Sequence, residues 1–97
     1  MKKERTERGF SFTEFTDKYG DKCSLQKSSL ATEDCIWFGI KEAKPMIMAS
    51  KIIEGGTGWA NYPLPEDVFI STRMHLTQDQ VKELLPYLHK FVETGDL

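Results

Sequence analysis

Hydrophobic and polar residues alternate along five stretches of the chain, which is the pattern of β-strands with one buried face. These predicted strands cover residues 9–17, 22–29, 34–40, 45–53 and 68–76. The strongest signal is DCIWFGI at residues 34–40, which combines aromatic and β-branched side chains. Residues 54–67 are rich in Gly and Pro and are expected to form a long loop.

After the last predicted strand, the hydrophobic spacing changes to that of an α-helix. Apolar residues recur three, four and seven positions apart at Val81, Leu84, Leu85, Leu88, Phe91 and Val92. Thr77 and Gln80 have the spacing of a capping box, and Gly95 is a typical residue at a helix end. We therefore predict a helix over residues 77–94, with the three leucines of its apolar stripe buried against a sheet.

Together these elements predict an α+β fold: an antiparallel β-sheet of about five strands with one C-terminal amphipathic helix packed on one face. The 97 residues, of which 39% are hydrophobic and 29% charged, suit a single small globular domain. Within this domain, residues 1–8 are expected to form a charged N-terminal arm. Residues 9–76 would form the sheet region, and residues 77–94 the helix.

The strands at residues 22–29 and 34–40 are expected to pair as a hairpin. Their alternation patterns agree when Leu25 lies opposite Phe38, because apolar residues then share one side of the hairpin. The other side of the hairpin carries Ser24, Gln26, Ser28, Cys35, Trp37 and Gly39.

A candidate binding site follows from the alternation in the last strand, which places Arg73 and His75 opposite the apolar residues. The sheet face away from the helix is then expected to hold Gln26, Ser28, Trp37, Ser71, Arg73 and His75. An aromatic ring beside an arginine and a histidine suits recognition of a flat or anionic group. The alternative is a solvated outer face with a scattered aromatic residue.

The loop at residues 54–67 is a second candidate site, because it carries the large aromatic residues Trp59 and Tyr62. A loop of this length is uncommon in a small domain, and such loops can act as lids or as partner-binding segments. Alternatively, the two aromatic side chains anchor the loop to the rest of the domain. The sequence leaves open whether this loop or the face around Arg73 and His75 binds a partner.

No catalytic or metal-binding motif is recognisable in the sequence. Cys35 and His75 are conceivable as a nucleophile and a base, but no local motif supports this pairing. Two cysteines and two histidines do not have the spacing of a zinc site. Residues 55–58 are not followed by the Gly-Lys-Ser/Thr of a phosphate-binding loop. We therefore expect a non-catalytic protein without a metal or cofactor.

Charge and cysteine content narrow the expected partners and compartment. The 13 Lys and Arg against 15 Asp and Glu give a net charge of −2, which disfavours nucleic acid as the partner. Residues 1–8 are mostly charged and no apolar run is long enough for a membrane span, so we expect neither a secretory leader nor a membrane partner. Cys23 and Cys35 would then be free thiols on opposite sheet faces of a cytoplasmic protein, with a disulfide as the alternative.

Four segments carry a resemblance to known sequences: YGDKCSLQKSS at residues 19–29, IWFG at residues 36–39, RMHL at residues 73–76 and FVETG at residues 91–95. Together they resemble a group of short, uncharacterised phage and prophage proteins over about residues 10–97. The resemblance implies a viral protein that acts in the cytoplasm of a bacterial host. Small phage proteins of this kind often block host defences by binding.

We therefore expect a non-catalytic, phage-type binding protein that inhibits a host defence system by binding a host protein or a small anionic ligand. One alternative is an accessory protein or enzyme in nucleic-acid metabolism. Another is an oligomeric structural phage protein joined through the face of Trp37. A homodimer is also among the expected assemblies.

Overall fold

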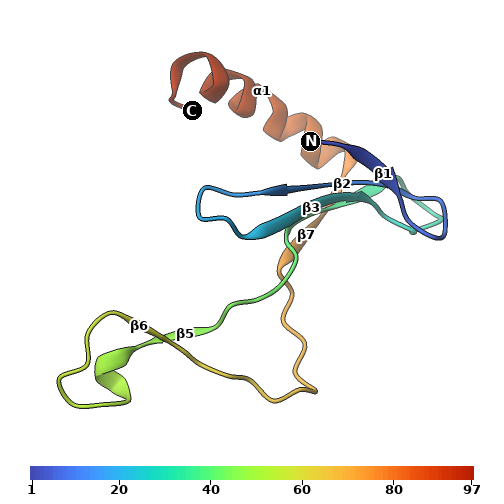
Figure 1. Cartoon of the computed structure of the whole chain (residues 1–97). Coiled ribbons are helices and arrows are strands. Elements are labelled where there is room, and N and C mark those ends of the chain that lie inside the picture. The colour runs from blue at the N-terminus through green and yellow to red at the C-terminus, as the bar shows by residue number, and fades with distance from the viewer. The chain divides into compact units, whose positions relative to one another are not determined.

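The computed structural model describes all 97 residues and has the predicted α+β architecture: a five-stranded antiparallel sheet, a second small sheet and one C-terminal helix (Figure 1). Its contacts divide the chain into two compact units. Residues 1–41 and 73–97 form the sheet unit, which contains the helix and the larger sheet. Residues 42–72 form the hairpin unit, which contains the smaller sheet.

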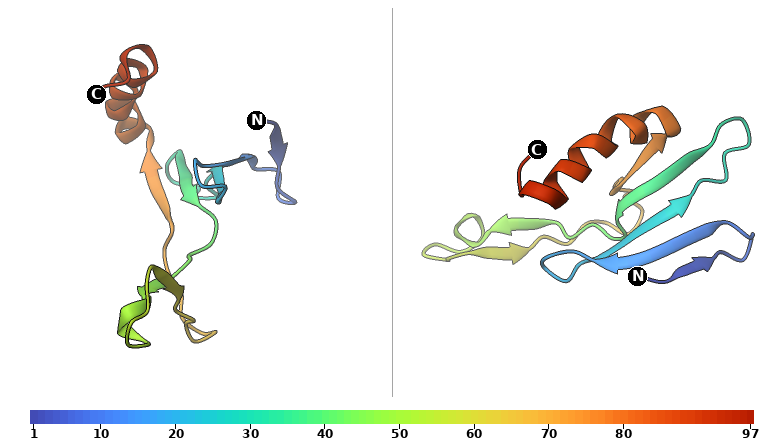
Figure 2. Two further views of the ribbon diagram at one scale, coloured as in Figure 1. Left: turned by 60° about the vertical axis from the view of Figure 1, so that its left-hand side comes forward. Right: turned by 90° about the horizontal axis from the view of Figure 1, so that it is seen from above.

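The larger sheet has the strand order β1-β2-β3-β4-β7, and each strand is antiparallel to its neighbours. Its strands are β1 (Lys3–Arg5), β2 (Ser11–Thr16), β3 (Lys22–Lys27), β4 (Cys35–Ile40) and β7 (Arg73–Thr77). Strands β1 to β4 follow one another along the chain, whereas β7 pairs with β4 after the whole hairpin unit (Figure 2). Strands β1 and β7 are therefore the edges of the sheet.

Strands β3 and β4 pair in the predicted register, with Leu25 opposite Phe38. Strand β2 continues this alternation without interruption from Phe12 to Thr16, so the Phe15 side chain joins the side of Leu25 while Phe12 lies on the other side. One side of the sheet, called the apolar face, is therefore made by Phe15, Cys23, Leu25, Ile36, Phe38, Met74 and Leu76.

Part of the charged arm expected at residues 1–8 is a short strand rather than free chain. Strand β1 pairs with β2, and the hydroxyl of Thr13 donates a hydrogen bond of 2.8 Å to the carbonyl of Lys2. All three residues of β1 are charged and exposed. A short charged edge strand of this kind discourages pairing with a further chain.

The hairpin unit differs from the sequence-based prediction for residues 45–53 and 54–67. Strand β5 (Met46–Met48) ends early at the 3₁₀ turn η1 (Ala49–Lys51), and β6 (Trp59–Asn61) lies inside the predicted loop. Strands β5 and β6 pair only with each other, so the predicted fourth strand is not part of the larger sheet. Two-residue alternation identifies strands but does not identify their partners, which explains this difference.

The last strand is shorter than the predicted residues 68–76. Its partner β4 ends at Ile40, and the register places Arg73 opposite Gly39. Only Ile40 of β4 lies beyond this pair, so residues before Thr72 have no β4 residue opposite them. Residues 68–72 belong instead to the hairpin unit.

Helix α1 (Gln78–Thr94) begins and ends where the sequence predicts. The Thr77 hydroxyl accepts a hydrogen bond from the Gln80 amide, and the Gln80 side chain accepts one from the Thr77 amide, which completes the capping box. Gly95 ends the helix with a φ of 79°, and its amide donates to the carbonyl of Phe91. The helix is neither long enough nor apolar enough to cross a membrane.

The predicted burial of the helix leucines is wrong within a single chain. No residue of α1 is buried, and Leu84, Leu85 and Leu88 are 42%, 46% and 50% exposed. The helix follows directly from β7, so only its first two turns approach the sheet. There, Val81 and Leu85 line an open groove of about 590 Å³ together with Ile36 and Leu76 of the apolar face.

Replacing Thr77 with alanine should destabilise helix α1 by about 1 kcal/mol, because the amide of Gln80 loses its capping acceptor. Circular dichroism during thermal unfolding should show a lower melting temperature and less helix before the transition. Thr57→Ala is a suitable control, since Thr57 is an exposed residue of the hairpin unit. Equal melting curves for the Thr77 variant and the unchanged chain would contradict the capping role.

Candidate ligand-binding site

A second set of side chains lies on the side of the sheet opposite the apolar face. Strands β3, β4 and β7 contribute alternate residues to it, because neighbouring residues of a strand point to opposite sides. This polar face consists of Ser24, Gln26, Ser28, Trp37, Arg73 and His75. Gly39 lies among them without a side chain.

Trp37 and His75 are opposite each other on β4 and β7, and their rings are stacked. The ring centroids are 3.9 Å apart and the planes differ by 7°. Nε2 of His75 is 2.9 Å from the hydroxyl of Ser28, which also accepts a hydrogen bond from the Leu30 amide. Ser28 is 3% exposed, so this buried hydroxyl fixes the orientation of the imidazole.

Arg73 extends across the sheet rather than away from it. Its Nη1 donates to Oγ of Ser24 at 3.4 Å and to Oε1 of Gln26 at 3.3 Å, and its guanidinium carbon is 5.6 Å from the centre of the Trp37 ring. Ser24 and Arg73 are on strands that flank β4, and the β4 residue between them is Gly39. The absent side chain of Gly39 leaves the path across β4 open.

The charge of Arg73 is not paired with a carboxylate. A depression of about 380 Å³ beside it is lined by Arg5, Thr6, Glu7, Phe12, Glu14, Ser24, Gln26, Lys41 and Arg73. Of its two acidic residues, Glu7 and Glu14, the second accepts a hydrogen bond of 2.5 Å from Lys41, and this bond and the lysine charge lower the pKa of Glu14. The Glu14 charge is therefore already balanced by Lys41.

Five of the predicted site residues are brought together by the fold, namely Gln26, Ser28, Trp37, Arg73 and His75. The prediction is wrong for Ser71, which is exposed in the hairpin unit because β7 begins only at Arg73. Ser24 and Gly39 were missing from the predicted site. The hairpin register gave their position, but nothing in the sequence showed that Arg73 would reach over Gly39 to Ser24.

The second candidate site, around Trp59 and Tyr62, lies in the hairpin unit. Trp59 is opposite Met48 on the two-stranded sheet, and the Tyr62 amide donates to the carbonyl of Pro45. Their side chains are 66% and 51% exposed. These two residues offer apolar surface but no charged group with a defined position.

The groups of the polar face are better suited to recognition than to catalysis. Ser28 and His75 resemble a nucleophile and its base, but the serine is buried and no carboxylate orients the imidazole. Cys35 is a free thiol whose pKa is raised by burial and by the nearby carboxylate of Glu33, so it is protonated at neutral pH. No three His, Cys, Asp or Glu side chains are grouped as metal ligands.

Comparisons of the chain with protein-family models, with curated proteins and with solved structures found no match. No relative therefore supplies a function for the polar face. The resemblance to short phage proteins stays a prediction.

Proposed function

We propose that this chain is a non-catalytic binding protein whose polar face holds a small anionic ligand that carries a flat ring. The observation that supports this proposal is Arg73, a half-buried arginine whose hydrogen-bond partners are the neutral side chains of Ser24 and Gln26. A guanidinium that is partly removed from water is stabilised most strongly by an anion. The ligand would supply this anion.

The donors of Arg73 suit a carboxylate or a phosphate. Both of its hydrogen bonds use Nη1, so Nε and Nη2 have no partner in the chain. These two nitrogens form one edge of the planar guanidinium and can donate two parallel hydrogen bonds to two oxygen atoms. Ser24 and Gln26 hold the guanidinium in place, which reduces the entropy lost on binding.

The stacked rings suit the flat part of the same ligand. One side of the His75 ring is covered by Trp37, and His75 is on the edge strand β7 with an exposed side chain. A planar group can therefore extend the stack on the open side of the imidazole. Because Nε2 is engaged with Ser28, Nδ1 of His75 is available for a hydrogen bond to the ligand.

The narrower part of the proposal concerns the biological setting. The resemblance to phage proteins supports a role in the cytoplasm of an infected bacterium, where capture of a small anionic molecule would inhibit a host defence system. Binding of a host protein through the same face is the competing possibility. Binding of a small anion and binding of a host protein would both require Arg73. The two possibilities differ in the mass of the bound molecule.

Replacing Arg73 with alanine should weaken ligand binding at least about tenfold, which corresponds to about 1.4 kcal/mol. Adenosine 5′-monophosphate is a suitable probe because it carries a flat ring and a phosphate, with adenosine and inorganic phosphate as its separate parts. Trp37 fluorescence in a Trp59→Phe background reports binding at the polar face. Mass spectrometry of chain purified from bacterial cytosol would detect a retained small anion.

Lys51→Ala is the control, since Lys51 is an exposed basic residue of the hairpin unit, whereas the polar face is on the larger sheet. Its affinity should equal that of the unchanged chain, and the melting temperature of the Arg73 variant should remain nearly the same. Equal affinity of the Arg73 variant would overturn the proposed site. Absence of any retained anion and of any response to the probe would overturn the small-ligand proposal. If the unchanged chain then captured a host protein and the Arg73 variant did not, this result would favour binding of a host protein through the polar face.

A further inference from the structure

The sheet unit leaves two apolar surfaces uncovered. The stripe of helix α1 becomes more exposed along its length, from the half-buried Val81 to Leu88 at 50% and Val92 at 83%. On the apolar face, Phe38 is only half-buried and Met74 is 54% exposed. The buried apolar residues of the entire chain are the two cysteines, and no large side chain is fully buried.

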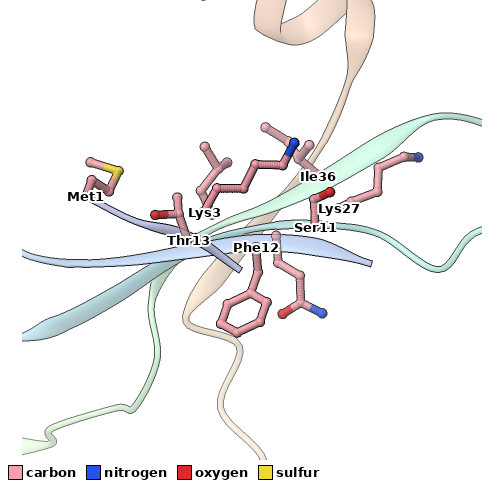
Figure 3. A pocket seen from close by; sticks show the side chains of 9 residues that line it. Met1, Lys3, Ser11, Phe12, Thr13, Lys27 and Ile36 are labelled. Atoms are coloured by element: carbon pink, nitrogen blue, oxygen red, sulfur yellow. The ribbon is translucent and has the colours of Figure 1, made fainter. Parts of the chain in front are cut away.

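The apolar face is also hollowed next to strand β1. A depression of about 380 Å³ there is lined by Met1, Lys3, Ser11, Phe12, Thr13, Leu25, Gln26, Lys27 and Ile36. Figure 3 shows Lys3, Thr13 and Ile36 rising from one side of the strands, while Phe12 points to the other side. The apolar face therefore has room for side chains from another element.

The exposed area indicates how much surface is left to cover. The chain exposes 8458 Å² for a mass of 11.2 kDa, whereas a compact monomer of this mass exposes about 5,700 Å². The difference is about 2,800 Å² per chain. Two copies that each covered about half of this difference would bury about 2,800 Å² together, which is the range of obligate homodimers.

We infer that a second copy of this chain covers both surfaces, with helix α1 of each copy packed on the apolar face of the other. One chain carries both a helix with an uncovered apolar stripe and a sheet with an uncovered apolar face. A two-fold axis therefore satisfies both surfaces of both copies at once. Helix α1 meets its own sheet only near β7, so its second half is free to reach a partner (Figure 1).

This arrangement leaves the polar face accessible, because the two faces are on opposite sides of the same strands. The dimer does not depend on the proposed ligand, and the ligand does not depend on the dimer. In the inferred dimer, the contact between the two copies is made by the apolar face and helix α1. The face of Trp37 takes no part in it.

Sedimentation equilibrium of the unchanged chain should give a mass of about twice 11.2 kDa at micromolar concentration. Leu88→Asp should raise the dissociation constant at least about tenfold, because a charge would enter the apolar contact. Tyr87→Asp is the matched control: Tyr87 is 57% exposed, similar to Leu88, but lies off the apolar stripe. The control should remain dimeric.

A second measurement identifies the surfaces in contact and does not need a variant. In a mixture of isotopically labelled and unlabelled chains, nuclear Overhauser effects between copies should connect Leu88 of one copy with Phe38 or Met74 of the other. The melting temperature should also rise with chain concentration. A monomer with a concentration-independent melting temperature would overturn the inference. A dimer insensitive to Leu88→Asp, or one without these effects between copies, would also overturn it.

Discussion

Replacing Phe38 with alanine should lower the free energy of unfolding of the sheet unit by about 2–4 kcal/mol. Phe38 is on the central part of the sheet, where it is opposite Leu25 on β3 and Met74 on β7. Its ring also meets that of Phe15 on β2, with centroids 6.0 Å apart and planes inclined by 57°. Removing the ring therefore weakens contacts among four strands at once.

A typical domain has a free energy of unfolding of about 5–15 kcal/mol, and the expected loss is a large share of it. Much of the chain should therefore unfold near body temperature. Urea unfolding followed by circular dichroism, at one fixed chain concentration, would measure it. Phe69→Ala is the matched control, because Phe69 is 90% exposed in the hairpin unit. A loss of less than about 1 kcal/mol for the Phe38 variant would mean that the apolar face contributes little to stability.

Replacing Gly39 with alanine should impair both stability and ligand binding. Gly39 has a φ of 150°, a conformation that residues with a side chain rarely adopt, and the strain should cost about 1–3 kcal/mol. A methyl group at this position would also stand between Arg73 and Ser24, which meet across β4. We therefore expect the affinity for adenosine 5′-monophosphate to fall at least about tenfold, as for Arg73→Ala.

Gly20→Ala separates the effect of backbone strain on stability from the effect on ligand binding. Gly20 also has a positive φ, of 84°, but it is in the turn between β2 and β3 and no atom lies within 4 Å of an added Cβ. This variant should therefore lose stability through strain and keep its full affinity for the probe. If Gly39→Ala bound the probe as well as Gly20→Ala does, Arg73 would not need the open path across β4.

The two sides of the larger sheet differ in chemical character across strands β3, β4 and β7, because neighbouring residues of a strand point to opposite sides. Leu25 and Phe38 contribute to the apolar face, whereas their chain neighbours Gln26 and Trp37 contribute to the polar face. A ligand on one side and a second copy on the other would therefore not compete. The proposed function and the inferred dimer can be tested independently for this reason.

The sequence by itself determined the features that depend on residues close together in the chain. The capping box of Thr77 and Gln80 and the terminal Gly95 fixed the bounds of helix α1, because their hydrogen bonds span one turn. The pairing of Leu25 with Phe38 followed from two alternation patterns joined by a short connection. Three of the eight predicted site residues, Gln26, Ser28 and Trp37, are together for the same reason.

Only the tertiary structure decided which distant segments meet. Pairing of β7 with β4 brings Arg73 over Gly39 and His75 onto Trp37, although the whole hairpin unit lies between these strands in sequence. Strand pairing over such distances depends on the total balance of packing and chain entropy, which no local pattern encodes. The same balance left the helix stripe exposed, because an amphipathic stripe requires an apolar partner but does not specify that the partner is in the same chain.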